Sequence, residues 1–239
     1  PVDQFGAIRQ PWIDKQMFYK LPFNFCDRWC ERCKLNKICR VYQKEINRKR
    51  TGSVFKSLAK DFKEMNAMLK KDLKRFNIKM TKKDLGEIEK EEESNEDEVK
   101  KDRLYILCSD IKHLLNDILE DIHQCYFGEM PLLLNEAFEV LTYYTMFIAP
   151  KIYRSTLSEI EEKIMIDDTT NDSKTSAFLA SGAIEKISSA LQIITNTNGT
   201  PLPVKKDARN LIPELKKINE LIIDRFGLFN ILGLKIPHV

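Results

Sequence analysis

Residues 102–126 read DRLYILCSDIKHLLNDILEDIHQCY, and this stretch decides the fold class. Its apolar centre consists of residues that recur every three or four positions: Ile111, Leu115, Ile118 and Ile122. This period places them on one face of an α-helix and leaves the charged residues on the other face. The stretch therefore predicts an amphipathic helix that buries one face against further helices.

Three more blocks with the same period follow, at about 131–165, 173–196 and 207–226. Pro150 predicts a break or kink in the first of them, and Pro213 either starts or kinks the last. The run ASGA at Ala180–Ala183 offers small residues where a neighbouring helix can approach closely. Short connections between these blocks predict an all-α protein, an antiparallel helical bundle over residues 104–239.

The composition agrees with this expectation. The 239 residues are 43% hydrophobic and include only 8 Gly and 9 Pro, which suits long helices and one substantial core. The chain has no uncharged apolar run of about 18 residues and no positively charged leader followed by an apolar stretch. We therefore expect a cytoplasmic protein without a membrane partner.

Three segments precede the predicted bundle. Residues 1–50 form an aromatic arm and a cysteine-rich segment, residues 51–80 a basic helix that Thr51 or Ser53 caps, and residues 81–103 a highly charged linker or solvated helix. The apolar positions of the basic helix fall at core spacing: Phe55, Leu58, Phe62, Met65, Leu69, Leu73 and Phe76. The spacing predicts an amphipathic helix with a lysine-rich outer face.

Charge is distributed unevenly along the chain. Residues 1–80 carry 20 Lys and Arg against 8 Asp and Glu, whereas residues 81–239 carry 19 against 28. The basic third could contact a nucleic acid, an acidic protein partner or the chain's own acidic remainder. We favour the internal or merely solvated arrangement, because the aromatic residues of this third follow the core spacing and not the basic face.

The most specific pattern is a C-x3-C-x2-C-x5-C segment, FCDRWCERCKLNKIC, which contains Cys26, Cys30, Cys33 and Cys39. Four clustered thiolates complete the ligand set of a zinc ion or an iron–sulfur cluster. Disulfides are the weaker interpretation, because the cytosol keeps thiols reduced and such short loops strain a bridge. Reduced or redox-active thiols are the remaining alternative.

The choice between the two metals depends on geometry. Zinc needs sulfur atoms about 4 Å apart, which a continuous helix over these cysteines cannot supply, so the segment must turn. A cubane cluster spreads its ligands farther apart, and the CERCK run lacks the glycine typical of zinc knuckles. These points favour a 4Fe–4S cluster over zinc.

The portion CERCKLNKIC resembles the auxiliary-cluster segment of SPASM-type radical enzymes, which helps to bind a 4Fe–4S cluster. Taken whole, the chain resembles an uncharacterised bacterial family that combines a CD-x-x-CERC segment with a helical bundle. In this chain the shared features are Cys26–Cys39, Glu139–Arg154 and Ala177–Leu191. The resemblance implies a bundle and a metal segment, and it adds no activity.

Other residues suggest weaker sites. Asp110 with His113 and Glu120 with His123 have the spacing of di-iron ligands, and Glu136 and Glu139 follow them. All six point away from the apolar stripes, so we expect them at solvated or rim positions. Cys108 and Cys125 are expected as buried thiols. The residues Tyr143, Tyr144, Met146 and Phe147 make their helix apolar nearly all round and predict that it is central.

No phosphate-binding glycine loop and no hydrolase motif is present, so the sequence favours a non-catalytic role. The leading hypothesis is a metal-binding accessory protein that acts in interaction or redox sensing, with a protein partner. A second hypothesis is an iron–sulfur electron-transfer or redox enzyme component. A third is a nucleic-acid-binding regulator that uses the basic third.

Overall fold

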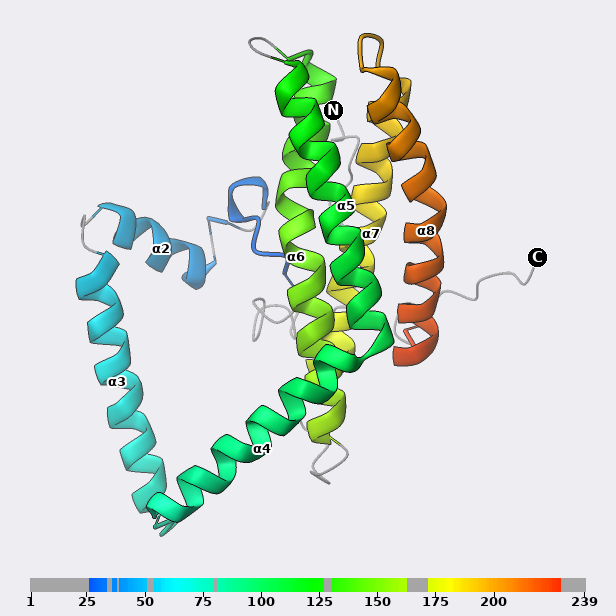
Figure 1. The fold of residues 1–239 in the computed structure, drawn as a ribbon. Coiled ribbons are helices and arrows are strands. Elements are labelled where there is room, and N and C mark those ends of the chain that lie inside the picture. The colour runs from blue at the N-terminus through cyan, green and yellow to red at the C-terminus, as the bar shows by residue number, and fades with distance from the viewer. Residues whose placement is uncertain are drawn as a thin grey trace. The chain divides into compact units, whose positions relative to one another are not determined.

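A computed structural model describes residues 26–33, 36–37, 39–50, 54–79, 81–126, 130–162 and 172–228. The described residues form one short 3-10 turn and seven α-helices and contain no strand, which confirms the predicted all-α class (Figure 1). The predicted aromatic arm, the two candidate cap residues Thr51 and Ser53, and the C-terminal tail lie outside the described residues. The elements are η2 (Cys30–Arg32), α2 (Arg40–Arg50), α3 (Val54–Arg75), α4 (Lys82–Lys101), α5 (Arg103–Cys125), α6 (Leu132–Glu162), α7 (Asp172–Asn196) and α8 (Leu202–Phe226).

The chain divides into two compact units. The described part of the first unit runs from residue 95 to residue 228, and the second unit comprises residues 21–94. The division falls within α4, inside the segment that the sequence predicts as a linker. We refer to the first unit as the bundle and to the second as the cysteine unit.

The bundle is an antiparallel four-helix arrangement of α5, α6, α7 and α8 (Figure 1). Each helix packs on its neighbour in sequence, and α5 also packs on α8, which closes the ring. The predicted stripe of α5 is buried as expected, since Leu115 and Ile122 are fully inaccessible to solvent. Burying a leucine or isoleucine side chain of this kind contributes roughly 1.5–3 kcal/mol.

Helix α7 is the most deeply buried helix of the bundle. Its small residues Ala180 to Ala183 are all buried, which allows α6 and α8 to approach closely. Among the described helices, α7 alone is long and apolar enough to cross a membrane by length and composition. Within the bundle, 67% of that apolar window is buried, as in the core helix of a globular bundle.

The structure corrects two of the alternatives predicted for the prolines: a break of the helix near Pro150 and a helix start at Pro213. Helix α6 continues without interruption through Pro150, because this residue is exposed and the carbonyl that loses its amide donor can face water. Helix α8 begins at Leu202, five residues before the predicted start at 207. Pro201 precedes its first turn, where a missing N–H leaves no hydrogen bond unmade, so Pro213 lies inside the helix and does not start it.

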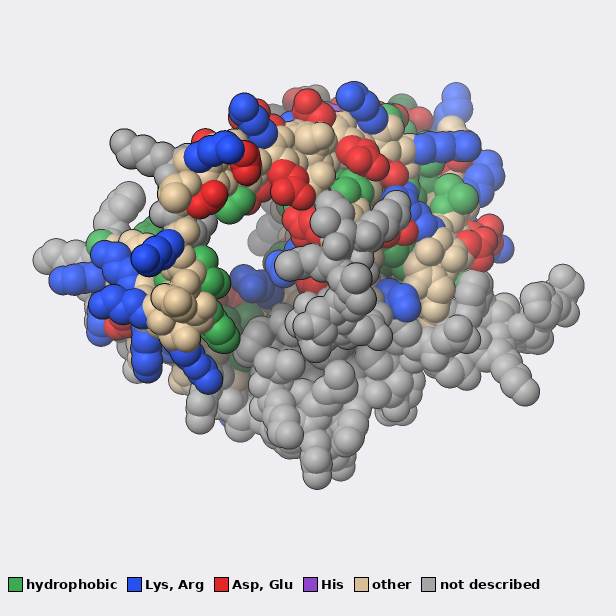
Figure 2. All heavy atoms as spheres, turned by 90° about the horizontal axis from the view of Figure 1, so that it is seen from below, with side chains coloured by type: hydrophobic (Ala, Val, Ile, Leu, Met, Phe, Trp, Pro, Cys, Tyr) green, Lys and Arg blue, Asp and Glu red, His purple; other side chains and the backbone are tan. Residues whose placement is uncertain are grey.

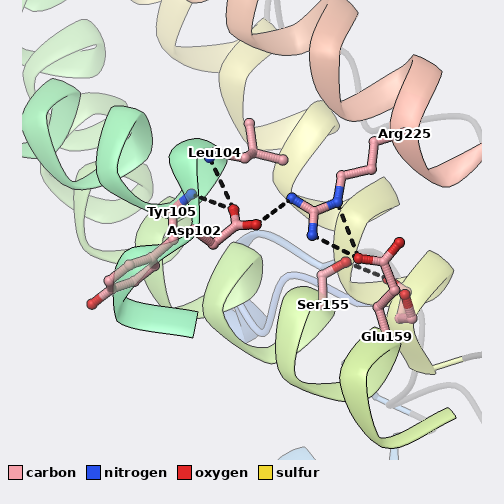
Figure 3. Close-up of polar contacts among 7 residues, drawn as sticks. Asp102, Leu104, Tyr105, Ser155, Glu159 and Arg225 are labelled. Atoms are coloured by element: carbon pink, nitrogen blue, oxygen red, sulfur yellow. Dashed lines mark hydrogen bonds and ion pairs between the residues drawn. The ribbon is translucent and has the colours of Figure 1, made fainter. Parts of the chain in front are cut away.

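An ionic cluster joins three helices at one end of the bundle (Figure 3). Asp102 caps α5 by accepting hydrogen bonds from the backbone N–H groups of Leu104 and Tyr105, at 2.9 and 3.1 Å. The Arg225 guanidinium of α8 contacts Asp102 at 2.7 Å and Glu159 of α6 at 2.6 Å. All three charged side chains are less than one-third exposed, so the cluster is better shielded from water than a typical surface ion pair.

The cysteine unit has well-formed helix ends. Thr81 and Asp84 form a capping box at the start of α4, with reciprocal hydrogen bonds of 3.2 and 2.7 Å. Helix α3 ends at Arg75; Asn77 in the turn after it adopts a left-handed conformation (φ 54°), and the N–H of Ile78 donates to the carbonyl of Leu73. No described side chain between residues 26 and 94 is buried, however. The described side chains of these helices therefore share no buried core.

Candidate metal centre

The four-cysteine segment is a succession of tight turns. Asp27 accepts a hydrogen bond from the backbone N–H of Trp29 at 3.1 Å, and this side-chain turn supports the left-handed conformation of Arg28 (φ 60°). Trp29 has φ −77° and ψ 69°, and the N–H of Cys30 contacts the carbonyl of Arg28 at 2.8 Å, which defines an inverse γ-turn. Arg28 thus adopts the left-handed conformation that a glycine usually provides in a tight turn.

The turns continue to the start of α2. The short helix η2 ends at Cys33, whose N–H donates to the carbonyl of Cys30 at 3.2 Å. Cys39 directly precedes α2, and its carbonyl accepts from the N–H of Gln43 at 3.0 Å. The side chain of Gln43 donates to the carbonyls of Asn36 and Lys37 and so ties the intervening loop to α2. Cys39 therefore lies at a helix N-terminus, where the helix dipole favours a negative charge.

Three of the four thiols influence one another electrostatically. Burial, and to a smaller extent the negative charges of Cys26, Glu45, Cys39 and Glu31, together raise the pKa of the Cys30 thiol to about 11. The pKa of Cys26 is also raised, first by burial, although a hydrogen bond from the backbone N–H of Arg28 lowers it. Cys26, Cys30 and Cys39 thus lie within electrostatic range of one another.

Cys33 shares the half-buried position of the other three cysteines. All six cysteines of the chain are thiols and none forms a disulfide. Across the described residues, no group of three or more His, Cys, Asp or Glu side chains has its donor atoms gathered around one point where a metal ion could sit. The described segment therefore brings Cys26, Cys30 and Cys39 into one neighbourhood without arranging their sulfur atoms as ligands.

Trp29 and Arg32 form the outer side of the turn segment. The guanidinium of Arg32 lies 4.3 Å from the centre of the Trp29 ring, a cation–π contact. Because Trp29 immediately precedes Cys30, its indole reports on the same turn that carries the thiol. The sequence shows a tryptophan three residues before an arginine, but the cation–π contact depends on the 3-10 turn that places residues 29 and 32 on one side.

The weaker candidates lie apart from this centre. Asp110, His113, Glu120 and His123 are exposed or half-buried, away from the buried stripe, as expected. Glu139 accepts a hydrogen bond from Asn135 at 3.3 Å, and Glu136 is half-buried. None of these residues belongs to a described cluster with metal-ligand geometry.

The two bundle cysteines differ from each other. Cys108 is buried as predicted, and burial together with the charge of Asp102 raises its pKa to about 12. Cys125 is exposed, so the prediction that it is buried is wrong. It is the last residue of α5, three residues after Ile122, the last buried residue of this helix.

The aromatic residues of α6 belong largely to the interior. Tyr144 is buried, and its hydroxyl group forms a hydrogen bond with the amino group of Lys186 on α7. Its ring also makes edge-on contacts with Tyr143 and Phe147, at centroid distances of 5.1 and 6.0 Å. Met146 is 59% exposed, so α6 is not buried all round. The sequence identified these aromatic residues but not Lys186, which lies 42 residues away.

Comparisons with known proteins add no relatives. No protein-family model matches the chain, and neither a curated protein nor a solved structure gives a significant match. The bacterial family that the cysteine segment resembles therefore stays a prediction.

Proposed function

We propose that the cysteine unit is a metal-binding module in which Cys26, Cys30, Cys33 and Cys39 hold a 4Fe–4S cluster or a zinc ion. The observation that carries this proposal is the electrostatic coupling of Cys26, Cys30 and Cys39 in a segment made of turns. Cys33 ends the same 3-10 turn that Cys30 begins. Soft thiolates in such a set suit iron–sulfur clusters and zinc rather than magnesium or calcium.

The surroundings of the thiols support a cation at this position. As thiolates, Cys26, Cys30 and Cys39 repel one another, and Glu45 adds a further negative charge. A bound metal removes this penalty, because coordination deprotonates a thiol and neutralises its charge. The hydrogen bond from the Arg28 N–H to Cys26 stabilises the ionised sulfur in the same way.

Metal binding also explains how the cysteine unit is stabilised although none of its described side chains is buried. Because no described side chain of residues 26–94 is buried, the hydrophobic effect contributes little to holding the turns together. Ligation supplies folding free energy directly, and it draws the sulfur atoms closer together than they lie as thiols. Thiolate ligands are also open to oxidation, which releases the metal. We therefore assign an accessory role in interaction or redox sensing.

The test is the metal content of protein purified without oxygen. We expect about one zinc ion or one cluster per chain, with a visible absorption band for the cluster and none for zinc. In the Cys30→Ala/Cys33→Ala variant this content falls to background. The matched control is Cys125→Ala, which removes an exposed thiol from the bundle and leaves the content unchanged.

A second readout uses the indole beside the site. Trp29 is one of two tryptophans in the chain and precedes Cys30 directly. We expect removal of the metal by a chelator to change the fluorescence of Trp29 in a Trp12→Phe background. Wild-type metal content in the double cysteine variant would contradict the proposal, as would a metal-free wild-type protein whose thiols all react with an alkylating reagent under anaerobic conditions.

A further inference from the structure

Helix α3 exposes a continuous apolar face. Five large hydrophobic side chains of α3 and of the turn after it are each more than half accessible to solvent, whereas Leu73 is half-buried: Phe62 at 58%, Met65 at 56%, Met68 at 67%, Leu69 at 54% and Phe76 at 65%. The sequence predicted apolar residues at the spacing of a core-facing helix, and these residues are present at that spacing, but their side chains are not buried. So many neighbouring apolar side chains in water are typical of an interaction surface.

The exposed side chains form a stripe and not a scatter. At about 100° per residue, Phe62, Met65, Leu69 and Phe76 fall within roughly 60° of one another around the helix axis. Ile78, which is 52% exposed, follows directly after the turn that ends α3. The stripe therefore extends along the second half of the helix and past its end.

The cationic side chains occupy the other side of α3. The described cations all lie roughly 110° or more from the centre of the stripe and all are exposed: Lys60, Lys63, Lys70, Lys71, Lys74 and Arg75. Figure 2 shows Lys and Arg side chains gathered at its left edge, on the side where α3 lies in Figure 1, with hydrophobic side chains beside them. Asp72 is the one described acid near the stripe, about 50° from its centre.

The charge decides which partner fits this helix. Residues 54–75 carry seven Lys or Arg and three Asp or Glu, a net charge of +4. Two copies of α3 packed face to face would cover both apolar stripes but leave the lysines of each copy, which lie on the far side, without a counter-charge. Helix α4 carries a net charge of −4, but Leu85 and Ile88 are its only large exposed apolar side chains, too few to cover the stripe.

A nucleic acid would contact the lysines of α3 but not its apolar stripe. Phosphate groups pair with the lysines, but they leave the apolar stripe in water. An anionic lipid bilayer satisfies both halves, because an amphipathic helix lies in the headgroup layer with its apolar face in the acyl boundary and its lysines among the phosphates. A long helix with a strongly segregated, basic polar face matches this mode of binding.

We propose that α3 is a peripheral membrane-binding helix that lies flat on an anionic lipid surface, with Phe62, Met65, Leu69 and Phe76 in the acyl boundary. This inference is independent of the metal proposal, since it rests on α3 alone. It differs from the sequence-based expectation of no membrane partner, which considered membrane-spanning segments and not surface binding.

The experiment is flotation of the full-length protein with two kinds of vesicle: phosphatidylcholine alone, and phosphatidylcholine with phosphatidylserine in equal parts. We expect binding to the anionic vesicles that weakens as salt is raised, and little binding to the neutral ones. Phe62→Gln/Leu69→Gln keeps good helix formers and should lower the affinity at least tenfold. Lys63→Gln/Lys70→Gln/Lys74→Gln should lower it roughly 100-fold.

Two further variants make the test specific to this face. Leu114→Gln/Leu132→Gln removes equally exposed leucines from the bundle and should bind as the wild type does. Asp72→Asn removes the acid beside the stripe and should strengthen binding to anionic vesicles severalfold. The circular dichroism of each variant confirms that the helix content is retained.

Four results would overturn the proposal. The first is no binding to the anionic vesicles, and the second is equal binding to the neutral ones. The third is wild-type binding by the Phe62→Gln/Leu69→Gln variant. The fourth is self-association, or tight binding to RNA or DNA, that the same variant abolishes while no vesicle binds, because the stripe then has a different occupant.

Discussion

The bundle and the cysteine unit are both helical, yet they use helices differently. In the bundle, every helix packs on two others, and residues such as Leu115 and Leu191 are fully buried. In the cysteine unit, α4 starts with a capping box and α3 is followed by the left-handed Asn77, but no described side chain is buried between residues 26 and 94. Local hydrogen bonding therefore specifies where a helix lies in the chain, whereas only tertiary burial makes it part of a core.

The sharpest test of this difference compares matched leucines. Leu115→Ala should lower the free energy of unfolding by about 2–5 kcal/mol, because it leaves a cavity in the packed core. Leu69→Ala on α3 should change it by less than about 0.5 kcal/mol, because the side chain is 54% exposed. Denaturant unfolding followed by circular dichroism gives both values. Equal costs would show that α3 belongs to the same core.

The ionic cluster at one end of the bundle should have the next largest effect. Arg225→Ala leaves the carboxylates of Asp102 and Glu159 without their cation and should cost about 2 kcal/mol. The matched control is Arg154→Ala, which breaks a 2.6 Å pair with Asp172 whose arginine is 61% exposed. The control should cost at most about 1 kcal/mol. A cost for Arg225→Ala no larger than that of the control would mean that the cluster contributes no more than a surface pair.

Alkaline pH should act on the bundle through Cys108. Its pKa in the folded protein is about 12, above the ordinary value of 9.0, so the unfolded chain releases this proton first. The stability contribution is complete below about pH 9 and is lost as the pH rises toward 12. At pH 10.5 the loss reaches about 2 kcal/mol.

The measurement is the free energy of unfolding as a function of pH for the wild type and two variants. Cys108→Ala should show a shallower decline than the wild type above pH 9, because the buried thiol is gone. Cys125→Ala should decline as the wild type does, since that side chain is exposed. Identical slopes for all three proteins would contradict the burial of Cys108.

The smallest expected effect is that of removing the cysteine unit from the bundle. A chain that starts at Asn95 also lacks residues 1–20 and should still unfold cooperatively, with a midpoint close to that of the bundle in the full-length protein, because the buried apolar side chains of the described residues lie between Val99 and Leu228. If the proposed metal is bound, its removal should likewise alter the Trp29 signal and leave the bundle transition in place. Loss of cooperative unfolding in the truncated chain would show that earlier residues complete the core.

The sequence by itself determined the helices and the position of the buried stripe of α5. Apolar period, capping residues and turn residues act over a few positions, so these local features are enough to place the helices along the chain. The main errors also concerned local features. The sequence predicted the start of α8 at residue 207, whereas the helix begins at Leu202 with prolines in and before its first turn. It also suggested a break near Pro150, which lies on an exposed side of an unbroken α6. The four cysteines were found from their spacing alone.

Only the tertiary structure decided which apolar faces are covered. The stripe of α5 and the stripe of α3 follow the same period, but α5 meets α6 and α8, and α3 keeps its face in water. The partners of Arg225 lie 66 and 123 residues away, a distance along the chain that no periodic pattern reports. Periodicity is a property of one helix, whereas burial is a property of the pair that packs, and therefore depends on contacts between residues far apart in sequence.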